Sequence, residues 1–190
     1  MASGAEATAA NSNAARDSAA RENGGGARAV RSGMKEIRIE TVILASGEQV
    51  WQVLTGFPAY CTWNPAIRRA RGQARPGERL DLRVVLFGFL EWELTALVVA
   101  AEAPRHLAWK AHLGAPFLFA AEHSFDIQSA AQEGVVLIQR ETYSGLLAPL
   151  LAPLLAPFTR RTFEQMNQAL AGMAEGAACT AASTSSAPES

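Results

Sequence analysis

Two ionisable residues, His123 and Glu141, have the types and positions that proton-transfer chemistry requires. His123 alternates with Phe125 along one apolar-rich segment, and Glu141 alternates with Leu137 along the next. Because successive side chains of a strand point to opposite faces, each ionisable group should share a face with core residues. We therefore predict that the two segments form neighbouring antiparallel strands and that both side chains approach an internal cavity.

The chemistry of such a pair would depend on the state of the imidazole. A carboxylate near an imidazole raises the pKa of the imidazole and selects one of its tautomers. In an enzyme, His123 and Glu141 could then move a proton during aldol cyclisation, dehydration or hydrolysis. The alternative is that the two side chains only hydrogen-bond within the fold or face solvent.

Large apolar and aromatic side chains are the other candidate site residues. Tyr143 could offer its hydroxyl to a ligand, or it could pack as an ordinary core tyrosine. Trp63 could stand at a cavity mouth or pack within its turn, and Trp109 could belong to the core or to a cavity wall. The predicted ligand-binding residues are Trp63, Trp92, Trp109, Phe119, Phe125, Tyr143, Leu150, Leu154, Phe158 and Met166.

Signatures of metals, cofactors and nucleic acid are absent from the sequence. Neither H-x-x-x-H nor C-x-x-C spacing occurs, so we predict no metal site. No Walker A motif or G-x-S-x-G elbow occurs, and we predict no cofactor. The formal net charge of -1 provides no general attraction to nucleic acid, and we predict no nucleic-acid partner.

The elements that would position these residues can be read from periodicity. Alternation in "KEIRIETVIL" (35–44) predicts a half-buried strand, and Ser46 with Gln49 predicts the capping box of a short helix. A second short helical turn is expected at about 58–63. Further strands with Gly or Pro between them, and hence antiparallel neighbours, are predicted at 67–71, 78–87, 90–101, 106–113, 117–128 and 134–145.

The chain should end its fold with one long helix, because Phe163, Met166 and Leu170 recur at helical spacing. In front of it lies "GLLAPLLAPLLAPF" (145–158), whose roughly 13 apolar residues fall short of the roughly 20 that cross a bilayer, so we predict no integral membrane span. Interior prolines disrupt helices, so we expect an irregular or kinked start from about 148. This segment could be a lid over the cavity, or it could simply pack on the sheet.

Four stretches carry a family resemblance in their order and spacing: "VWQVLTGFPAYCTWNPAI", "FAAEHSFDI", "IQRETYSGLL" and "FEQMNQAL". Over about 36–172 the chain resembles the START-like superfamily, also called SRPBCC or the polyketide cyclase/dehydrase and lipid transport group. The resemblance implies the α+β helix-grip fold. In that fold a curved antiparallel sheet of about six to seven strands surrounds one long C-terminal helix, two short helices follow the first strand, and a hydrophobic cavity lies inside.

The same resemblance does not imply one chemistry. We predict binding or carriage of a small hydrophobic ligand, a lipid or polyketide-like molecule, because inward polar candidates are few. The alternative is a polyketide cyclase, aromatase or dehydratase that uses His123 and Glu141 for proton transfer. A surface that binds another protein is a third possibility, and neither the ligand nor the oligomeric state can be read from the sequence.

The two ends of the chain differ in composition from the middle. Residues 1–33 and 174–190 are rich in Ala, Ser and Gly and poor in large apolar residues, so we predict a disordered N-terminal arm and C-terminal tail around a domain at 35–173. Cys179 lies in that tail, which makes a structural disulfide with Cys61 unexpected. This cysteine usage predicts a cytoplasmic location.

Overall fold

The computed structural model describes residues 35–131 and 133–185. The arm predicted at 1–33 lies outside the described residues. The strands are β1 (Lys35–Ile43), β2 (Ile67–Arg71), β3 (Arg79–Leu86), β4 (Leu90–Glu102), β5 (His106–Leu113), β6 (Phe119–Ser129) and β7 (Val135–Ser144). The helices are α1 (Gly47–Thr55), the 3-10 turn η1 (Phe57–Ala59), α2 (Tyr60–Trp63) and α3 (Ala148–Ser185).

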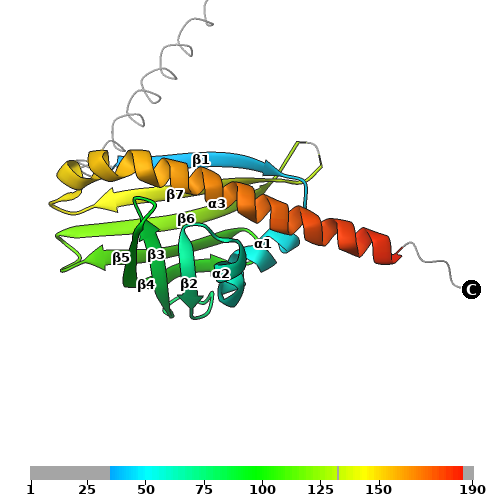
Figure 1. Cartoon of the computed structure of the whole chain (residues 1–190), viewed down its shortest axis with the longest axis horizontal. Helices are drawn as coiled ribbons and strands as arrows, with labels where there is room; N and C mark the ends of the chain where they lie inside the picture. Colours follow the sequence, from blue (N-terminus) through cyan, green and yellow to red (C-terminus); the bar gives the residue numbers. More distant parts are fainter. Residues whose placement is uncertain (1–34, 132, 186–190) are drawn as a thin grey trace, which may run out of the picture. The chain divides into compact units, whose positions relative to one another are not determined.

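The strands form one seven-stranded antiparallel sheet in the order β1-β7-β6-β5-β4-β3-β2. Short connections make β3 to β7 successive neighbours, whereas the helical segment after β1 carries the chain to the opposite edge of the sheet. Figure 1 shows the sheet curling around α3, which lies along its concave side. The predicted helix-grip architecture is confirmed, including the short helices that follow the first strand.

Local side-chain hydrogen bonds set the helical segment after β1. The predicted capping box is present: Ser46 Oγ accepts from the backbone N–H of Gln49 at 3.2 Å, and Gln49 Oε1 accepts from the backbone N–H of Ser46 at 2.9 Å. Further on, Asn64 Oδ1 accepts from the backbone N–H groups of Ala66 at 2.9 Å and Ile67 at 3.0 Å. These bonds start β2 and fix the edge of the sheet.

The core lies between the concave face of the sheet and α3. Met166, Leu170 and Ala174 of α3 are fully buried in the main apolar cluster. The helix continues to Ser185, past residue 173, where we predicted the domain to end. Burial of Ala174 and a 2.9 Å hydrogen bond from the Leu44 N–H to the next side chain, Glu175, hold the first of these additional residues against the domain.

The leucine–proline segment is helical from Ala148 onward, where the helix was expected to start, and α3 runs unbroken through Pro153 and Pro157, so the irregular form of the predicted start is wrong. Pro153 and Pro157 stand inside the helix and face outward, where water can hydrate the carbonyls that they leave unpaired. Ala148 and Ala152 are fully buried on the opposite side. Small residues thus let the helix dock closely on the sheet, and this packing outweighs the proline penalty of about 3 kcal/mol per residue.

Candidate functional site

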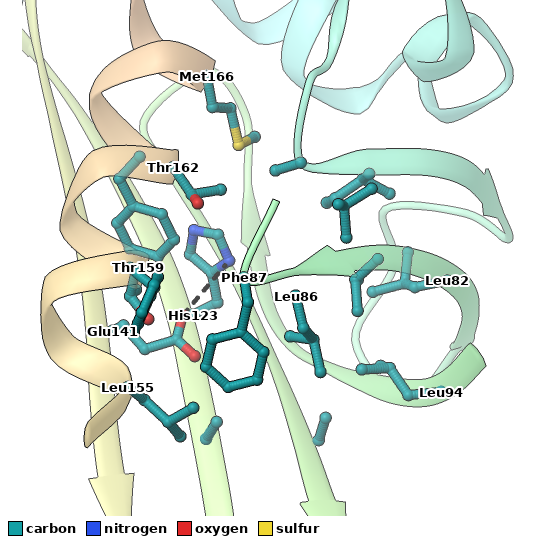
Figure 2. A pocket seen from close by; sticks show the side chains of 18 of the residues that line it. Leu82, Leu86, Phe87, Leu94, His123, Glu141, Leu155, Thr159, Thr162 and Met166 are labelled. Carbon is teal, nitrogen blue, oxygen red and sulfur yellow. Dashed lines mark ion pairs between the residues drawn. The ribbon is translucent and has the colours of Figure 1, made fainter. Parts of the chain in front are cut away.

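A cavity of about 180 Å³ lies between the sheet and the first half of α3. Most of its wall is apolar, and its polar groups gather where β6, β7 and α3 meet. Figure 2 shows His123 and Glu141 with Thr159 and Thr162 on one side and Phe87 on the other. The lining residues are Ala66, Ile67, Leu82, Val84, Val85, Leu86, Phe87, Leu94, Trp109, Ala111, Ala121, His123, Glu141, Leu155, Phe158, Thr159, Thr162, Phe163 and Met166.

His123 and Glu141 lie directly opposite each other on β6 and β7. The distance from His123 Nδ1 to Glu141 Oε2 is 3.7 Å, and the two side chains are 11% and 15% exposed. The predicted juxtaposition of an imidazole and a carboxyl group on neighbouring strands, both facing the cavity, is therefore present in the structure.

The electrostatics of this pair differ from the prediction. Burial lowers the pKa of His123 to about 3 and raises the pKa of Glu141 to about 8. The loss of hydration disfavours both charged forms more than their mutual attraction favours them. The prediction that the carboxylate would raise the imidazole pKa is therefore wrong, and near pH 7 the cavity holds a neutral imidazole beside a protonated carboxyl group.

Gln139 determines which nitrogen of His123 carries the proton. Its side-chain Nε2 lies 2.7 Å from His123 Nε2, and an amide nitrogen can only donate. His123 Nε2 is therefore the acceptor, so the proton is on Nδ1, the atom that faces Glu141. The sequence analysis did not single out Gln139; the available signal was an amide alternating with Leu137 and Glu141.

Aromatic rings hold the imidazole of His123 in place. It stacks on Phe163 of α3 at a centroid distance of 4.6 Å and on Phe125 at 4.5 Å, while Trp109 meets it edge-on at 4.9 Å. The Nδ1–H group is thus presented to the cavity in one orientation. Phe163 was predicted only as a core residue of the terminal helix.

Some of the predicted ligand-binding side chains line the cavity. Trp109, Phe158 and Met166 do so together with His123 and Glu141. They come from β5, β6, β7 and α3, so the register of the sheet and the docking of the helix are both needed to bring them together.

Other predicted ligand-binding side chains lie outside the lining. Trp63 packs edge-on against Tyr60, with 4.9 Å between ring centroids. Trp92 is exposed near the start of β4. Leu150 and Leu154 are exposed on the outer side of α3. The prediction that these residues contact the cavity is wrong, because strand parity and helical spacing do not say which end of an element reaches it.

Phe119, Phe125 and Tyr143 are core residues beside the cavity. Phe125 is fully buried behind His123. Phe119 and Tyr143 stack on each other at 5.6 Å, and the Tyr143 hydroxyl lies 2.8 Å from the Thr159 hydroxyl. Burial raises the pKa of Tyr143. Tyr143 thus packs as a core residue and does not line the cavity.

The tip of the β3–β4 hairpin forms part of the cavity wall, which the sequence analysis did not foresee. Phe87 has a φ of 56°, a conformation that costs a non-glycine residue about 1–3 kcal/mol. Its ring meets Phe158 of α3 edge-on at 4.9 Å. The sequence showed only a strand break at Gly88, because the contact depends on where the hairpin tip meets the helix.

The described part of the chain forms neither a cluster of metal ligands nor a membrane-spanning helix. Among residues 35–131 and 133–185, no group of three or more His, Cys, Asp or Glu side chains could hold a metal ion. Within the same part of the chain, no helix is long and apolar enough to cross a membrane.

Comparison with known proteins finds one family that matches most of the chain. The family described as "Polyketide cyclase / dehydrase and lipid transport" matches residues 34–176. No curated protein sequence matches the chain.

Several solved structures share the fold. The di-domain aromatase/cyclase StfQ of the steffimycin biosynthetic pathway has a TM-score of 0.63 and 13% identity, over 76% of this chain and 52% of that one. The Zhui aromatase/cyclase from Streptomyces sp. R1128 has a TM-score of 0.62 and 20% identity, over 75% and 94%. A START superfamily protein from Mycobacterium smegmatis has a TM-score of 0.58 and 23% identity, over 75% and 97%.

Proposed function

The chain belongs to the polyketide cyclase/dehydrase and lipid transport family, and we propose that it binds one small hydrophobic molecule in the cavity between the sheet and α3. The observation that carries the proposal is the character of the wall: an apolar lining with polar groups confined to one side. Ligand sites typically combine these two features, because apolar walls supply affinity and a few polar groups set orientation.

The polar side of the cavity indicates what the ligand should carry. The His123 Nδ1–H and the protonated Glu141 carboxyl group can both donate, and the hydroxyls of Thr159 and Thr162 lie on the facing helix. A carbonyl or hydroxyl oxygen of the ligand would satisfy these donors. An apolar molecule with one such oxygen-bearing end therefore fits best.

The size of the cavity limits the part of the ligand that is enclosed. At about 180 Å³ it is smaller than the roughly 300–1,000 Å³ of common ligand pockets, and close to the roughly 150 Å³ that holds a benzene molecule. One ring or a short chain fits with Phe87 and Phe158 in contact. A larger ligand would extend past these rings or displace them.

The test combines native mass spectrometry of the purified full chain with a cavity-filling variant. Ala121 lines the cavity, and Ala121→Leu should fill part of it. Ala59→Leu, at an exposed position of η1, is the matched control. We expect a co-purified apolar molecule on the wild type and Ala59→Leu but not on Ala121→Leu. Equal occupancy of all three proteins would contradict the proposed site.

A second candidate function, catalysis of a cyclase, aromatase or dehydratase type, is favoured by the pairing of His123 and Glu141. A carboxyl pKa near 8 suits proton transfer near neutral pH. A neutral Nδ1–H can stabilise a developing oxyanion, as neutral imidazoles do in other enzymes. On this hypothesis Glu141 moves the proton and His123 donates the hydrogen bond.

A synthetic poly-β-ketone thioester would test the catalytic hypothesis. Glu141→Gln should abolish cyclised or dehydrated product while leaving binding of the thioester measurable. Product formation at the wild-type rate by this variant would exclude Glu141 as the proton-transfer group and leave binding as the function.

A further inference from the structure

The outer face of the first part of α3 is apolar where a helix of a globular protein is normally polar. Over residues 149–158, about three turns, its exposed positions are prolines, leucines and one phenylalanine. Leu150 is 73% exposed and Leu154 is 60% exposed. The face becomes polar only at Arg160 and Arg161.

Two hairpin tips extend this apolar face beyond α3. The β5–β6 tip is joined to the start of α3 by a 3.0 Å hydrogen bond from the Leu146 N–H to the Phe117 carbonyl. The β3–β4 tip reaches α3 through the contact of Phe87 with Phe158, and the neighbouring Phe89 is 82% exposed. We call the exposed side chains of these segments the apolar rim: Phe89, Phe117, Leu146, Leu150, Leu154 and Phe158.

Glycine permits the close approach that builds the rim. Gly145 has a φ of 104°, and a Cβ atom there would lie 2.6 Å from the Leu118 carbonyl oxygen. The turn after β7 therefore lies directly against the β5–β6 tip. Figure 1 shows the start of α3 at the same end of the sheet as this hairpin.

The rim segments contain no carboxylate, and the arginine pair at their border is followed by Glu164 one turn further along α3. The segment 142–163 contains no Asp or Glu, and the tips at 84–90 and 111–121 contain none either. Arg160 and Arg161 are exposed at the border of the rim. The carboxylate closest in sequence to the β3–β4 tip, Glu91, has Arg83 at 3.8 Å.

We propose that the apolar rim docks the chain on the surface of a bilayer that contains anionic lipids. Exposed leucine and phenylalanine side chains would enter the interfacial hydrocarbon, and Arg160 and Arg161 would meet the lipid phosphates. An anionic surface complements the arginine pair at the border of the rim. The rim of a second copy complements the arginine pair less well, because the rim segments themselves contain no carboxylate.

Docking would place one wall of the cavity against the lipid. Phe158 belongs both to the apolar rim and to the cavity lining, and it contacts Phe87, which also lines the cavity. An apolar ligand could then pass between bilayer and cavity with little exposure to water. The docking surface itself does not depend on whether the cavity binds a ligand.

Vesicle flotation with the full chain tests the proposal. Vesicles of phosphatidylcholine alone and of phosphatidylcholine with phosphatidylglycerol are compared. The wild type should float with the mixed vesicles, and Leu150→Ser with Leu154→Ser should lower the partition coefficient by about tenfold or more, since two leucines no longer enter hydrocarbon. The matched control, Val42→Ser with Leu44→Ser, removes comparably exposed side chains at β1 and should bind as the wild type does.

The contribution of charge is measured separately. Arg160→Gln with Arg161→Gln should weaken binding to the mixed vesicles only, and added salt should have the same effect on the wild type. Circular dichroism confirms that each variant is folded.

Failure of the wild type to float with either kind of vesicle would overturn the proposal, as would equal flotation of the leucine double variant. Sedimentation velocity detects the competing outcome. A wild-type dimer that becomes monomeric in the leucine double variant, without vesicle binding, would assign the rim to a second copy.

Discussion

Replacing Glu141 by Gln should change how the stability of the fold depends on pH. Burial raises the pKa of Glu141 from 4.5 to about 8, so the folded chain keeps a proton that the unfolded chain releases. Burial lowers the pKa of His123 from 6.5 to about 3. Between these two pH values the unfolded chain therefore binds a proton at His123 that the folded chain does not bind. The two groups therefore act in opposite directions.

The size of the effect follows from these pKa values. A proton difference of one changes the free energy of unfolding by about 1.4 kcal/mol per pH unit. The contribution of Glu141 is present below about pH 4.5 and is lost as the pH rises to about 8. The contribution of His123 is present above about pH 6.5 and is lost as the pH falls to about 3.

The two slopes cancel between about pH 4.5 and 6.5, so the pair predicts a plateau of stability there. Between about pH 6.5 and 8 only Glu141 acts, and it should cost the wild type about 2 kcal/mol. Glu141→Gln lacks a titrating group at this position. Its stability relative to the wild type should therefore rise by about 2 kcal/mol over that interval.

Urea unfolding at a series of pH values measures this difference. Glu36→Gln, at an exposed position of β1, controls for the removal of one negative charge from the sheet. A difference between Glu141→Gln and the wild type that stays constant from about pH 6 to about pH 9 would refute the reasoning. It would mean that water enters the cavity and keeps the carboxyl group ionised.

Substitutions at three further positions test the packing of α3 and of the site. Pro153→Ala restores a helical N–H on the exposed face of α3, and it should raise the free energy of unfolding by up to about 3 kcal/mol in urea titrations. Phe87→Gly and Phe87→Ala both lose the ring contact with Phe158. The glycine variant should nevertheless have a free energy of unfolding about 1 kcal/mol higher than the alanine variant, because glycine adopts the positive φ without strain. Gln139→Leu should lower the free energy of unfolding by about 1–3 kcal/mol. It should also leave His123 as a mixture of its two neutral tautomers, which the NMR chemical shifts of the imidazole nitrogens distinguish.

Local patterns made parts of the fold predictable. The capping box of Ser46 and Gln49 involves residues three positions apart, so the sequence contains all the information that it needs. The pairing of His123 with Glu141 was predictable for a related reason. Alternation identified the inner face of each strand, and a short connection made the strands antiparallel neighbours.

The boundary of the cavity was less predictable, because parity identifies a face but not a position along it. His123 and Phe125 share a face of β6, yet only His123 lines the cavity, while Phe125 lies in the core behind it. Phe87 also lines the cavity, but it stands in a hairpin turn, where no periodicity of the sequence applies. Its role depends on the path of α3 across the sheet.

By itself, the sequence determined the order and type of the elements, the inner faces of the strands and the neighbouring positions of His123 and Glu141, because these depend on periodicity and short connections. The tertiary structure alone decided the protonation of that pair and the conformation of the leucine–proline segment. Desolvation is a property of the whole cavity, and it reversed the direction that a simple charge pair predicts for His123. Burial of Ala148 and Ala152 against the sheet likewise holds a helix that local proline chemistry disfavours.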